Sequence, residues 1–270
     1  MLLTVAPPDN DVLWARALVT SYRKPGGRTD AAGSPALRGV SLGVADGEFL
    51  AVTGPRGSGK STLLHCLSGQ LVPDEGEVWF HSRPVHALPE AERERLRRER
   101  FGWIATEPHL VPELTARENV ALPLLLSGVP RRAAKATALE WLDRLDAAAH
   151  ADLRPDRLSQ ASRQRVAVAR ALVTRPSVLF ADEPTAPLLY QTDRVQVLRT
   201  LVAVCRSSGI AVVMATSDEE VAEQADRTVA LREGRRSGGE SRRPAKPGAA
   251  VPASATTPLP KSADRCSASA

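Results

Sequence analysis

The sequence predicts an α/β fold with a parallel β-sheet. Two observations carry this prediction: apolar runs of strand length alternate with segments of helical periodicity along most of the 270 residues, and one such run leads through a glycine-rich loop directly into a helix. A third observation is a long stretch of helical periodicity between the two halves of the chain, which we interpret as a helical insertion. Strands that alternate with helices in this way are joined by right-handed crossovers.

Each strand is predicted at a short apolar run bounded by turn residues, and each helical segment where the apolar spacing becomes helical. The expected strands cover residues 12–22, 39–44, 49–53, 77–80, 177–181, 210–216 and 227–231. The expected helical segments cover residues 61–67, 89–100, 115–150, 155–174, 195–206 and 219–225. Residues 24–35 are a loop rich in glycine and proline, and Leu139, Leu142 and Leu145 are expected to share one helix face.

Residues 54–62, Gly-Pro-Arg-Gly-Ser-Gly-Lys-Ser-Thr, form a complete phosphate-binding loop between a buried strand and a helix. The glycines let the backbone turn tightly and point N–H groups at phosphate oxygens, and the helix start adds its own unpaired N–H groups. Lys60 reaches the β- and γ-phosphates, and Ser61 supplies a hydroxyl to Mg²⁺. Arg56 either adds charge near the phosphates or points to solvent. The expected nucleotide-binding residues of the loop are Gly54, Gly57, Ser58, Gly59, Lys60, Ser61 and Thr62.

Asp182 and Glu183 follow another apolar strand and form the second chemical site. Mg²⁺ prefers one or two carboxylates together with phosphate oxygens, so Asp182 is expected to complete the metal site with Ser61. Glu183 is expected to be catalytic, as the general base that polarises the attacking water. Two ordinary acids at a strand end are the alternative, and the phosphate-binding loop upstream favours the functional interpretation.

Composition restricts the class of protein. No run approaches the ~18 apolar residues that span a bilayer, the first residues lack a signal-peptide pattern, and the three cysteines show no metal-ligand spacing. The net charge of +5 comes entirely from residues 234–270, which hold seven Lys/Arg and two acids. Composition therefore gives no support for a nucleic-acid-binding surface on the core, and a cytoplasmic protein is expected.

Both ends of the chain are expected to lie outside the folded domain. Residues 1–10 are predicted to be a flexible N-terminus, and residues 234–270 a disordered basic tail with almost no large apolar side chains. The arginines of the tail allow contact with anionic lipid or nucleic acid, but a solvated extension is the simpler interpretation.

Several sequence blocks follow one another in a characteristic order: residues 47–49, 54–62, 63–65, 73–78, 114–123, 163–172 and 182–185. In this order and spacing the chain resembles the ATP-binding subunits of ABC transporters, in particular the branch that drives lipoprotein release and macrolide export. The resemblance implies a P-loop NTPase core with a parallel sheet, additional antiparallel strands and an inserted helical subdomain at about residues 107–165. The whole ATP-binding domain would cover residues 11–233.

The same resemblance implies how the protein works. It implies ATP and Mg²⁺ as ligands, Tyr22 as the aromatic residue that stacks on adenine, and Ser159 as a contact to a nucleotide held by a second ATP-binding subunit. It also implies a membrane-spanning permease subunit as partner and a peripheral position on the inner face of the cell membrane. A soluble family member acting on DNA or ribosomes is disfavoured because the chain has neither a duplicated cassette nor a large insertion, and no nucleic acid is expected as a partner.

The chain departs from the family pattern at four places. Thr106 stands where a glutamine is expected, Leu189 where an aspartate is expected and Ser217 where a histidine is expected, and residues 158–162 read Leu-Ser-Gln-Ala-Ser instead of Leu-Ser-Gly-Gly-Gln. Losing one preorganised transition-state donor costs roughly 10²–10³ in rate. Two hypotheses follow: an energy-coupling ATPase subunit of an exporter with impaired hydrolysis, or a nucleotide-binding but weakly active or inactive partner in a heterodimer.

Overall fold

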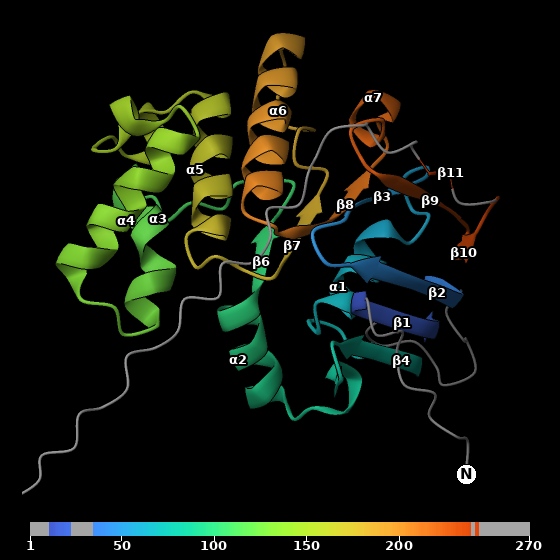
Figure 1. Cartoon of the computed structure of the whole chain (residues 1–270). Coiled ribbons are helices and arrows are strands. Elements are labelled where there is room, and N and C mark those ends of the chain that lie inside the picture. Colours follow the sequence, from blue (N-terminus) through green and yellow to red (C-terminus); the bar gives the residue numbers. More distant parts are fainter. Residues whose placement is uncertain (1–10, 23–34, 239–240, 243–270) are drawn as a thin grey trace, which may run out of the picture.

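The computed structural model describes residues 11–22, 35–238 and 241–242, which form two β-sheets and a block of helices (Figure 1). The larger sheet has the strand order β10-β9-β3-β8-β7-β6, in which β10 is the short edge strand Arg235–Arg236. Its parallel strands are β3 (Phe49–Thr53), β6 (Phe101–Ile104), β7 (Val178–Asp182), β8 (Ala211–Thr216) and β9 (Arg227–Arg232). The predicted α/β fold with a parallel sheet is confirmed.

A second, antiparallel sheet has the strand order β2-β1-β4-β5. It consists of β1 (Asp11–Thr20), β2 (Leu37–Ala45), β4 (Glu75–Phe80) and the short β5 (Arg83–Pro84). Helix α1 (Lys60–Leu67) shares one apolar cluster with both sheets, in which Leu63 and Leu67 of the helix are fully buried. The additional antiparallel strands implied by the family resemblance are therefore present, and they cover the helix that follows the phosphate-binding loop.

Three of the remaining helices form a block beside the parallel sheet, and the others lie separately (Figure 1). Helices α3 (Ala116–Leu126), α4 (Arg131–Arg144) and α5 (Gln160–Leu172) pack on one another, and α5 also contacts β6 and α6 (Gln191–Ser207). Helix α2 (Glu90–Arg100) buries only Leu96, and α7 (Glu219–Ala222) is a single turn beside β3 and β8. Short 3-10 turns cover Val85–Ala87, Ala148–His150 and Pro155–Arg157. The apolar faces of α3, α5 and α6 form one core with the second face of the parallel sheet.

The buried face of α4 differs from the sequence prediction in one residue. Leu142 and Leu145 are buried, whereas Leu139, which was expected on the same helix face, is 39% exposed. The packed face instead includes Ala134 and Ala138, which are fully buried against the rest of the helical block. Small side chains four residues apart allow close packing there, and this turns Leu139 toward the edge of the contact.

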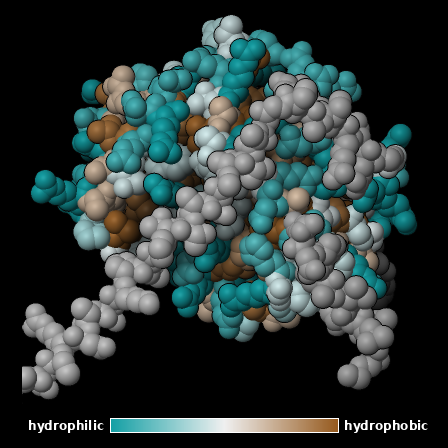
Figure 2. All heavy atoms as spheres, viewed as in Figure 1, coloured by the Kyte–Doolittle hydropathy of each residue, from teal (hydrophilic) through white to brown (hydrophobic). Residues whose placement is uncertain are grey.

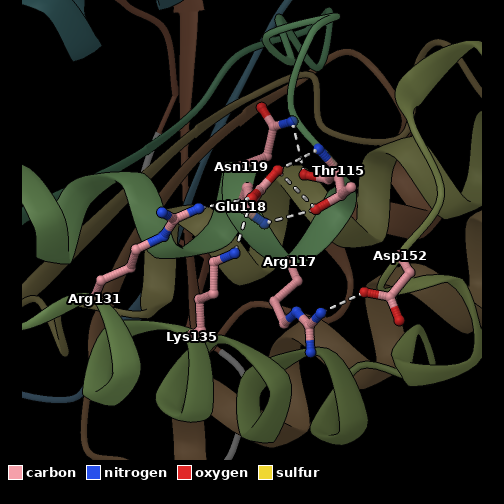
Figure 3. Close-up of polar contacts among 7 residues, drawn as sticks. All are labelled: Thr115, Arg117, Glu118, Asn119, Arg131, Lys135 and Asp152. Atoms are coloured by element: carbon pink, nitrogen blue, oxygen red, sulfur yellow. Dashed lines mark hydrogen bonds and ion pairs between the residues drawn. The ribbon is translucent and has the colours of Figure 1, made fainter.

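A capping network fixes the start of α3 (Figure 3). The Thr115 hydroxyl accepts a hydrogen bond from the Glu118 N–H, and the Glu118 carboxylate accepts one from the Thr115 N–H, which is a complete capping box. Lys135 of α4 donates to the same carboxylate at 2.9 Å. The Asn119 side chain, fully buried, bonds both the N–H and the carbonyl of Val111. This network ties the segment that precedes α3 to the helical block.

The C-terminal boundary is more structured than the sequence suggested. Residues 235–236 of the expected tail form β10 (Arg235–Arg236), and residues 241–242 form β11 (Ser241–Arg242), both paired antiparallel with β9. Glu233 and Gly234 between β9 and β10 both have positive φ, of 50° and 75°, which suits a two-residue hairpin turn. The remaining expectations for residues 1–10, for most of the loop at 24–35 and for residues 243–270 lie outside the described residues.

Most of the surface in Figure 2 is hydrophilic, with small separate hydrophobic patches. Within the described ranges, no helix has both the length and the apolar character that crossing a bilayer requires. Cys66 and Cys205 are buried and free, as their apolar surroundings in the sequence suggested. Among the described residues, the large apolar side chains that remain exposed are Tyr22, Val72, Leu126, Leu139, Leu189 and Tyr190.

Candidate functional site

The carboxyl ends of four adjacent parallel strands converge at one edge of the larger sheet. In spatial order, β3 ends before Gly54, β8 ends before Ser217, β7 ends at Asp182 and β6 ends shortly before Thr106. Ligands of open α/β sheets bind at this edge. The fold therefore brings together the phosphate-binding loop, the two acidic residues and two of the four departures from the family pattern.

The phosphate-binding loop has the backbone form that its glycines were expected to allow. Gly59 precedes α1 with φ 102°, and Gly57 and Gly54 have φ of 78° and 143°. The first intrahelical bond of α1 runs from the Leu63 N–H to the Gly59 carbonyl. The three preceding amides of the helix therefore have no intrahelical acceptor, and together with the helix dipole they can bind an anion.

The Lys60 side chain is buried and bound to the backbone of the loop. It is only 6% exposed, and its Nζ donates to the carbonyl oxygens of Gly54 at 2.8 Å and Pro55 at 3.2 Å. The same Nζ lies 3.5 Å from Glu183 Oε1. The ammonium group is thus fixed under the loop by side-chain and backbone partners at the place where an incoming phosphate would compete for it.

Two buried oxygen atoms at the site lack partners among the described residues: Ser58 Oγ and Asp182 Oδ1. Burial raises the pKa of the Asp182 carboxyl above its usual range, and the Ser61 hydroxyl beside it counters part of this shift. A buried carboxylate oxygen that lacks a partner is costly unless a cation pairs with it. The Asp182 and Ser61 oxygens are hard donors of the kind that Mg²⁺ binds, so the donor set fits this ion.

Glu183 has a strained backbone at the first position after β7. Its φ is 46°, a left-handed value that is uncommon for a residue other than glycine. Its N–H donates to the Ala215 carbonyl of β8 at 2.9 Å, and its own carbonyl accepts from the Ala186 N–H. These bonds turn the side chain back toward Lys60. Strain of this kind is concentrated at functional sites, where surrounding contacts hold it.

His65 lies nearby on α1, and the sequence patterns assigned it no role at the site. Burial lowers the pKa of its imidazole, whereas the negative charge of Asp182 acts in the opposite direction. Its ring centroid lies 5.0 Å from that of Trp103 on β6. The signal was available in the sequence, because His65 follows Ser61 by four residues and such residues lie on the same helix face.

The four departures occupy different positions. The Thr106 hydroxyl donates to the Asp182 carbonyl at 3.1 Å, so it is bound to the backbone of β7 instead of facing the loop. Ser217 is exposed directly after β8. Leu189, in the connection from β7 to α6, is 80% exposed. Ser159 caps the N-terminus of α5 in the helical block.

Tyr22 and Ser159 stand in different relations to the loop. Tyr22 is 56% exposed and its hydroxyl lies 3.2 Å from Thr62 Oγ1, so its ring lies beside the start of α1. The interactions of the Ser159 hydroxyl in the described residues are all within the helical block. One chain by itself therefore brings Tyr22, but not Ser159, to its own phosphate-binding loop.

A groove that the sequence analysis missed lies between α2, β6, α3 and α5. It encloses about 460 Å³, and its lining includes the apolar Trp103, Leu122 and Leu126, the basic Arg98 and Arg170 and the acidic Glu94. Arg170 donates to the carbonyls of Pro108 and His109, and so connects α5 with the segment after β6. Its residues come from three distant stretches of sequence, residues 94–103, 122–126 and 170–174, and only the fold assembles them.

Comparisons with known proteins agree with this geometry. A family model described as ABC transporter matches residues 37–186. The chain is 44% identical over 223 residues to the lipoprotein-releasing system ATP-binding protein LolD 2 of Caulobacter vibrioides, with coverage of 83% of this chain and 95% of the relative. It is 43% identical over 198 residues to the LolD protein of Paramagnetospirillum magneticum, with coverage of 73% and 87%. A solved ATP-binding cassette, in a dimeric post-hydrolysis state bound to ADP and Pi, superposes with a TM-score of 0.77 at 31% identity, covering 85% of this chain and 98% of that one.

Proposed function

The chain belongs to the ABC transporter family as an ATP-binding subunit, and we propose that it couples ATP binding and hydrolysis to export through a separate membrane-spanning partner, with hydrolysis impaired. The observation that carries the proposal is the sheet edge at which Lys60, Asp182 and Glu183 meet the phosphate-binding loop. A cation, an acid for metal binding and a candidate base are all needed for phosphoryl transfer to water.

ATP binding is assigned to the loop and to Tyr22. The loop amides and Lys60 would hold the phosphates, with Gly57, Ser58 and Gly59 forming the cradle and the Thr62 hydroxyl following it. The exposed ring of Tyr22 would stack on adenine, while its hydroxyl remains beside Thr62. Ser61 and Asp182 would hold Mg²⁺, which neutralises phosphate charge when it is bound.

Hydrolysis would depend on Glu183, whose carboxylate polarises the attacking water once the nucleotide draws Lys60 away from it. The impairment is inferred from the residues that would complete the site. Gln160 and Ala161 add side chains where a close backbone approach to a second subunit's nucleotide is needed, and Ser217 cannot reach as far as an imidazole.

The membrane-spanning partner is proposed to dock in the groove lined by Trp103, Leu122, Leu126 and Arg98. An apolar groove with basic side chains suits a short helical segment that carries acidic residues. In this proposal the protein lies peripherally on the inner face of the cell membrane. The ATP-binding domain is proposed to cover residues 11–233, with residues 107–165 as its helical subdomain, and a second ATP-binding subunit would complete the nucleotide sites.

A second candidate is a nucleotide-binding but weakly active or inactive partner in a heterodimer. The hydrogen bond from the Thr106 hydroxyl to the Asp182 carbonyl favours this candidate, because that hydroxyl is then bound to the backbone and does not face the nucleotide site. In that case an intact cassette would supply the signature sequence that acts on the nucleotide of this chain.

A titration of purified chain with Mg·ATP, together with phosphate-release measurements, tests the proposal. Lys60→Ala is expected to weaken ATP binding by at least roughly 100-fold, since it removes a charge-assisted contact from a buried site. Unchanged ATP retention in Lys60→Ala would contradict the assignment of the site. Rapid turnover by the chain without any partner would contradict the impairment, and binding without turnover in every combination would favour the second candidate.

A further inference from the structure

The end of α5 contains a chain of three polar side chains that the proposed function does not use. The Ser159 hydroxyl donates to Ser162 Oγ at 2.9 Å, and the Ser162 hydroxyl lies 3.4 Å from His150 Nδ1. Ser159 Oγ also accepts from the Ser162 N–H at 3.1 Å, which caps the helix. Ser159 and Ser162 belong to the altered signature at residues 158–162, and His150 ends the 3-10 turn Ala148–His150.

The direction of the protons matters because each serine hydroxyl has only one. Ser159 gives its proton to Ser162, so the proton of Ser162 is free for another acceptor, and His150 Nδ1 can accept it when the imidazole is the Nε2–H tautomer. Ser162 is 4% exposed, so bulk water offers no ready alternative partner. The Ser159 side chain itself is exposed, but its proton points into the helix cap.

Packing holds this arrangement in place. Ala161, between the two serines, is 7% exposed and forms a small apolar cluster with Leu188 of the β7–α6 connection and Val197 of α6. The N-terminus of α5 is therefore anchored to the loop that follows Glu183. A glycine at position 161 would lack the side chain that makes this contact.

We propose that Ser162 and His150 are positioning residues that keep the Ser159 proton inside the α5 cap and away from a nucleotide held by a second subunit. This inference rests on the proposed function, in which the altered signature of this chain approaches a nucleotide held by a second subunit. It assigns a specific cause to the impaired hydrolysis: the remaining hydroxyl of the altered signature is already committed as a donor.

The proton direction can be tested without any nucleotide. In ¹⁵N spectra of the free chain with a neutral imidazole, His150 is expected to be the Nε2–H tautomer, because Nδ1 accepts from Ser162. Its signals are assigned by their loss in His150→Gln. An Nδ1–H tautomer would overturn the inference, because His150 would then donate to Ser162 and leave the proton of Ser162 available to Ser159.

The functional consequence is tested with Ser162→Ala, which removes the acceptor but keeps the backbone N–H that Ser159 caps. In a Glu183→Gln background, which prevents turnover, sedimentation of the chain with Mg·ATP is expected to give a self-association constant roughly 10-fold tighter than without the Ser162 change, since one hydrogen bond to a charged group is gained. In the chain with Glu183, Ser162→Ala is expected to raise kcat with little change in KM.

A purely structural role for Ser162 predicts the opposite sign. Unchanged or weaker self-association in Ser162→Ala would overturn the inference, as would a gain that persists when Ser159→Ala is added. Ser207→Ala, which removes an exposed hydroxyl at the far end of α6, is the matched control and should change neither measurement. Failure of ATP binding in the unaltered chain would overturn the proposed function, but the tautomer of His150 would still be decided independently.

Discussion

Lys60 Nζ and Glu183 Oε1 lie 3.5 Å apart at the centre of the site. Their side chains are only 6% and 20% exposed, so this ion pair is poorly screened by solvent. In the free chain the cation expected to hold phosphate and the carboxylate expected to act as base therefore neutralise each other. Under the proposed function, a nucleotide would displace Glu183 from Lys60, and this separation would free the carboxylate for water only when ATP is bound.

The first prediction concerns this competition. Glu183→Gln removes the charge that competes for Lys60, so the affinity for Mg·ATP is expected to rise about 3–10-fold, which corresponds to about 1 kcal/mol. Turnover is expected to fall at least roughly 100-fold, because the general base is lost. Calorimetric titration and phosphate release measure the two effects. Glu140→Gln, at an exposed position of α4, should change neither, and a weaker affinity in Glu183→Gln would contradict the competition.

The second prediction separates two glycines of the loop. A Cβ at Gly59 would lie 2.5 Å from the Ala36 carbonyl oxygen, whereas a Cβ at Gly57 meets no atom within 4 Å. Gly57→Ala is therefore expected to cost only about 1–2 kcal/mol of folding stability, from the left-handed backbone alone, and to weaken ATP binding by crowding the phosphates. Gly59→Ala is expected to cost clearly more. Urea unfolding of both variants decides this, and equal stability losses would contradict it.

The parallel sheet and the site at its edge could be predicted because local signals agree there. Residues 49–67 combine an apolar strand, a glycine loop and a helix start, and Asp182 stands at the end of a second apolar strand. Functional residues at strand ends can thus be predicted from short segments of sequence. The β9–β10 hairpin was missed because Glu233 supplies one of its two positive φ values, and sequence patterns assign such values to glycine or asparagine.

Other features depend on contacts between distant segments and could not be predicted. The groove at Trp103 and Leu126 is assembled from four elements, and the ion pair joins Lys60 and Glu183, which are far apart in the sequence. The exposed position of Leu139 depends on which face of α4 the neighbouring helices cover. Hydrophobic spacing places a residue on a helix face, but it does not say which residues at the edge of that face will be covered.

The third prediction concerns the capping network of α3 in acid (Figure 3). Hydrogen bonds from Lys135 and from the Thr115 N–H lower the pKa of Glu118 to about 2, from an ordinary value of 4.5. Because the folded-state pKa is depressed, this stabilisation is fully present above pH 4.5 and is lost as the pH falls from there toward 2.

Glu118→Gln is therefore expected to lower the free energy of unfolding by about 1 kcal/mol at pH 7, a value reduced by the partial exposure of the side chain. The difference from the unaltered chain should shrink as the pH falls below 4.5. Denaturant unfolding between pH 7 and pH 3 measures it. Glu113→Gln, in the exposed turn before α3, is the control, and a difference that does not change with pH would contradict the assigned cause.

The last prediction tests whether the altered residues limit turnover. Gln160→Gly with Ala161→Gly restores a backbone that can approach the nucleotide of a second subunit, and Ser217→His restores an imidazole at the sheet edge. If each change restores one transition-state contact, worth roughly 10²–10³ in rate, the combined variant should hydrolyse ATP at least about 10-fold faster than the unaltered chain. Non-additivity within one site makes this a lower bound.

The gain should have a cost in stability. Ala161 is nearly buried against Leu188 and Val197, and glycine is a poor helix former, so the Ala161→Gly change is expected to lower the free energy of unfolding by about 1–2 kcal/mol. Phosphate release and thermal unfolding, measured on the same preparations, would show the two effects together. Faster turnover with lower stability would mean that the side chains at the start of α5 stabilise the fold of this chain and at the same time reduce its catalytic contact with the nucleotide. Unchanged turnover in a folded, ATP-binding variant would place the limiting step outside these residues.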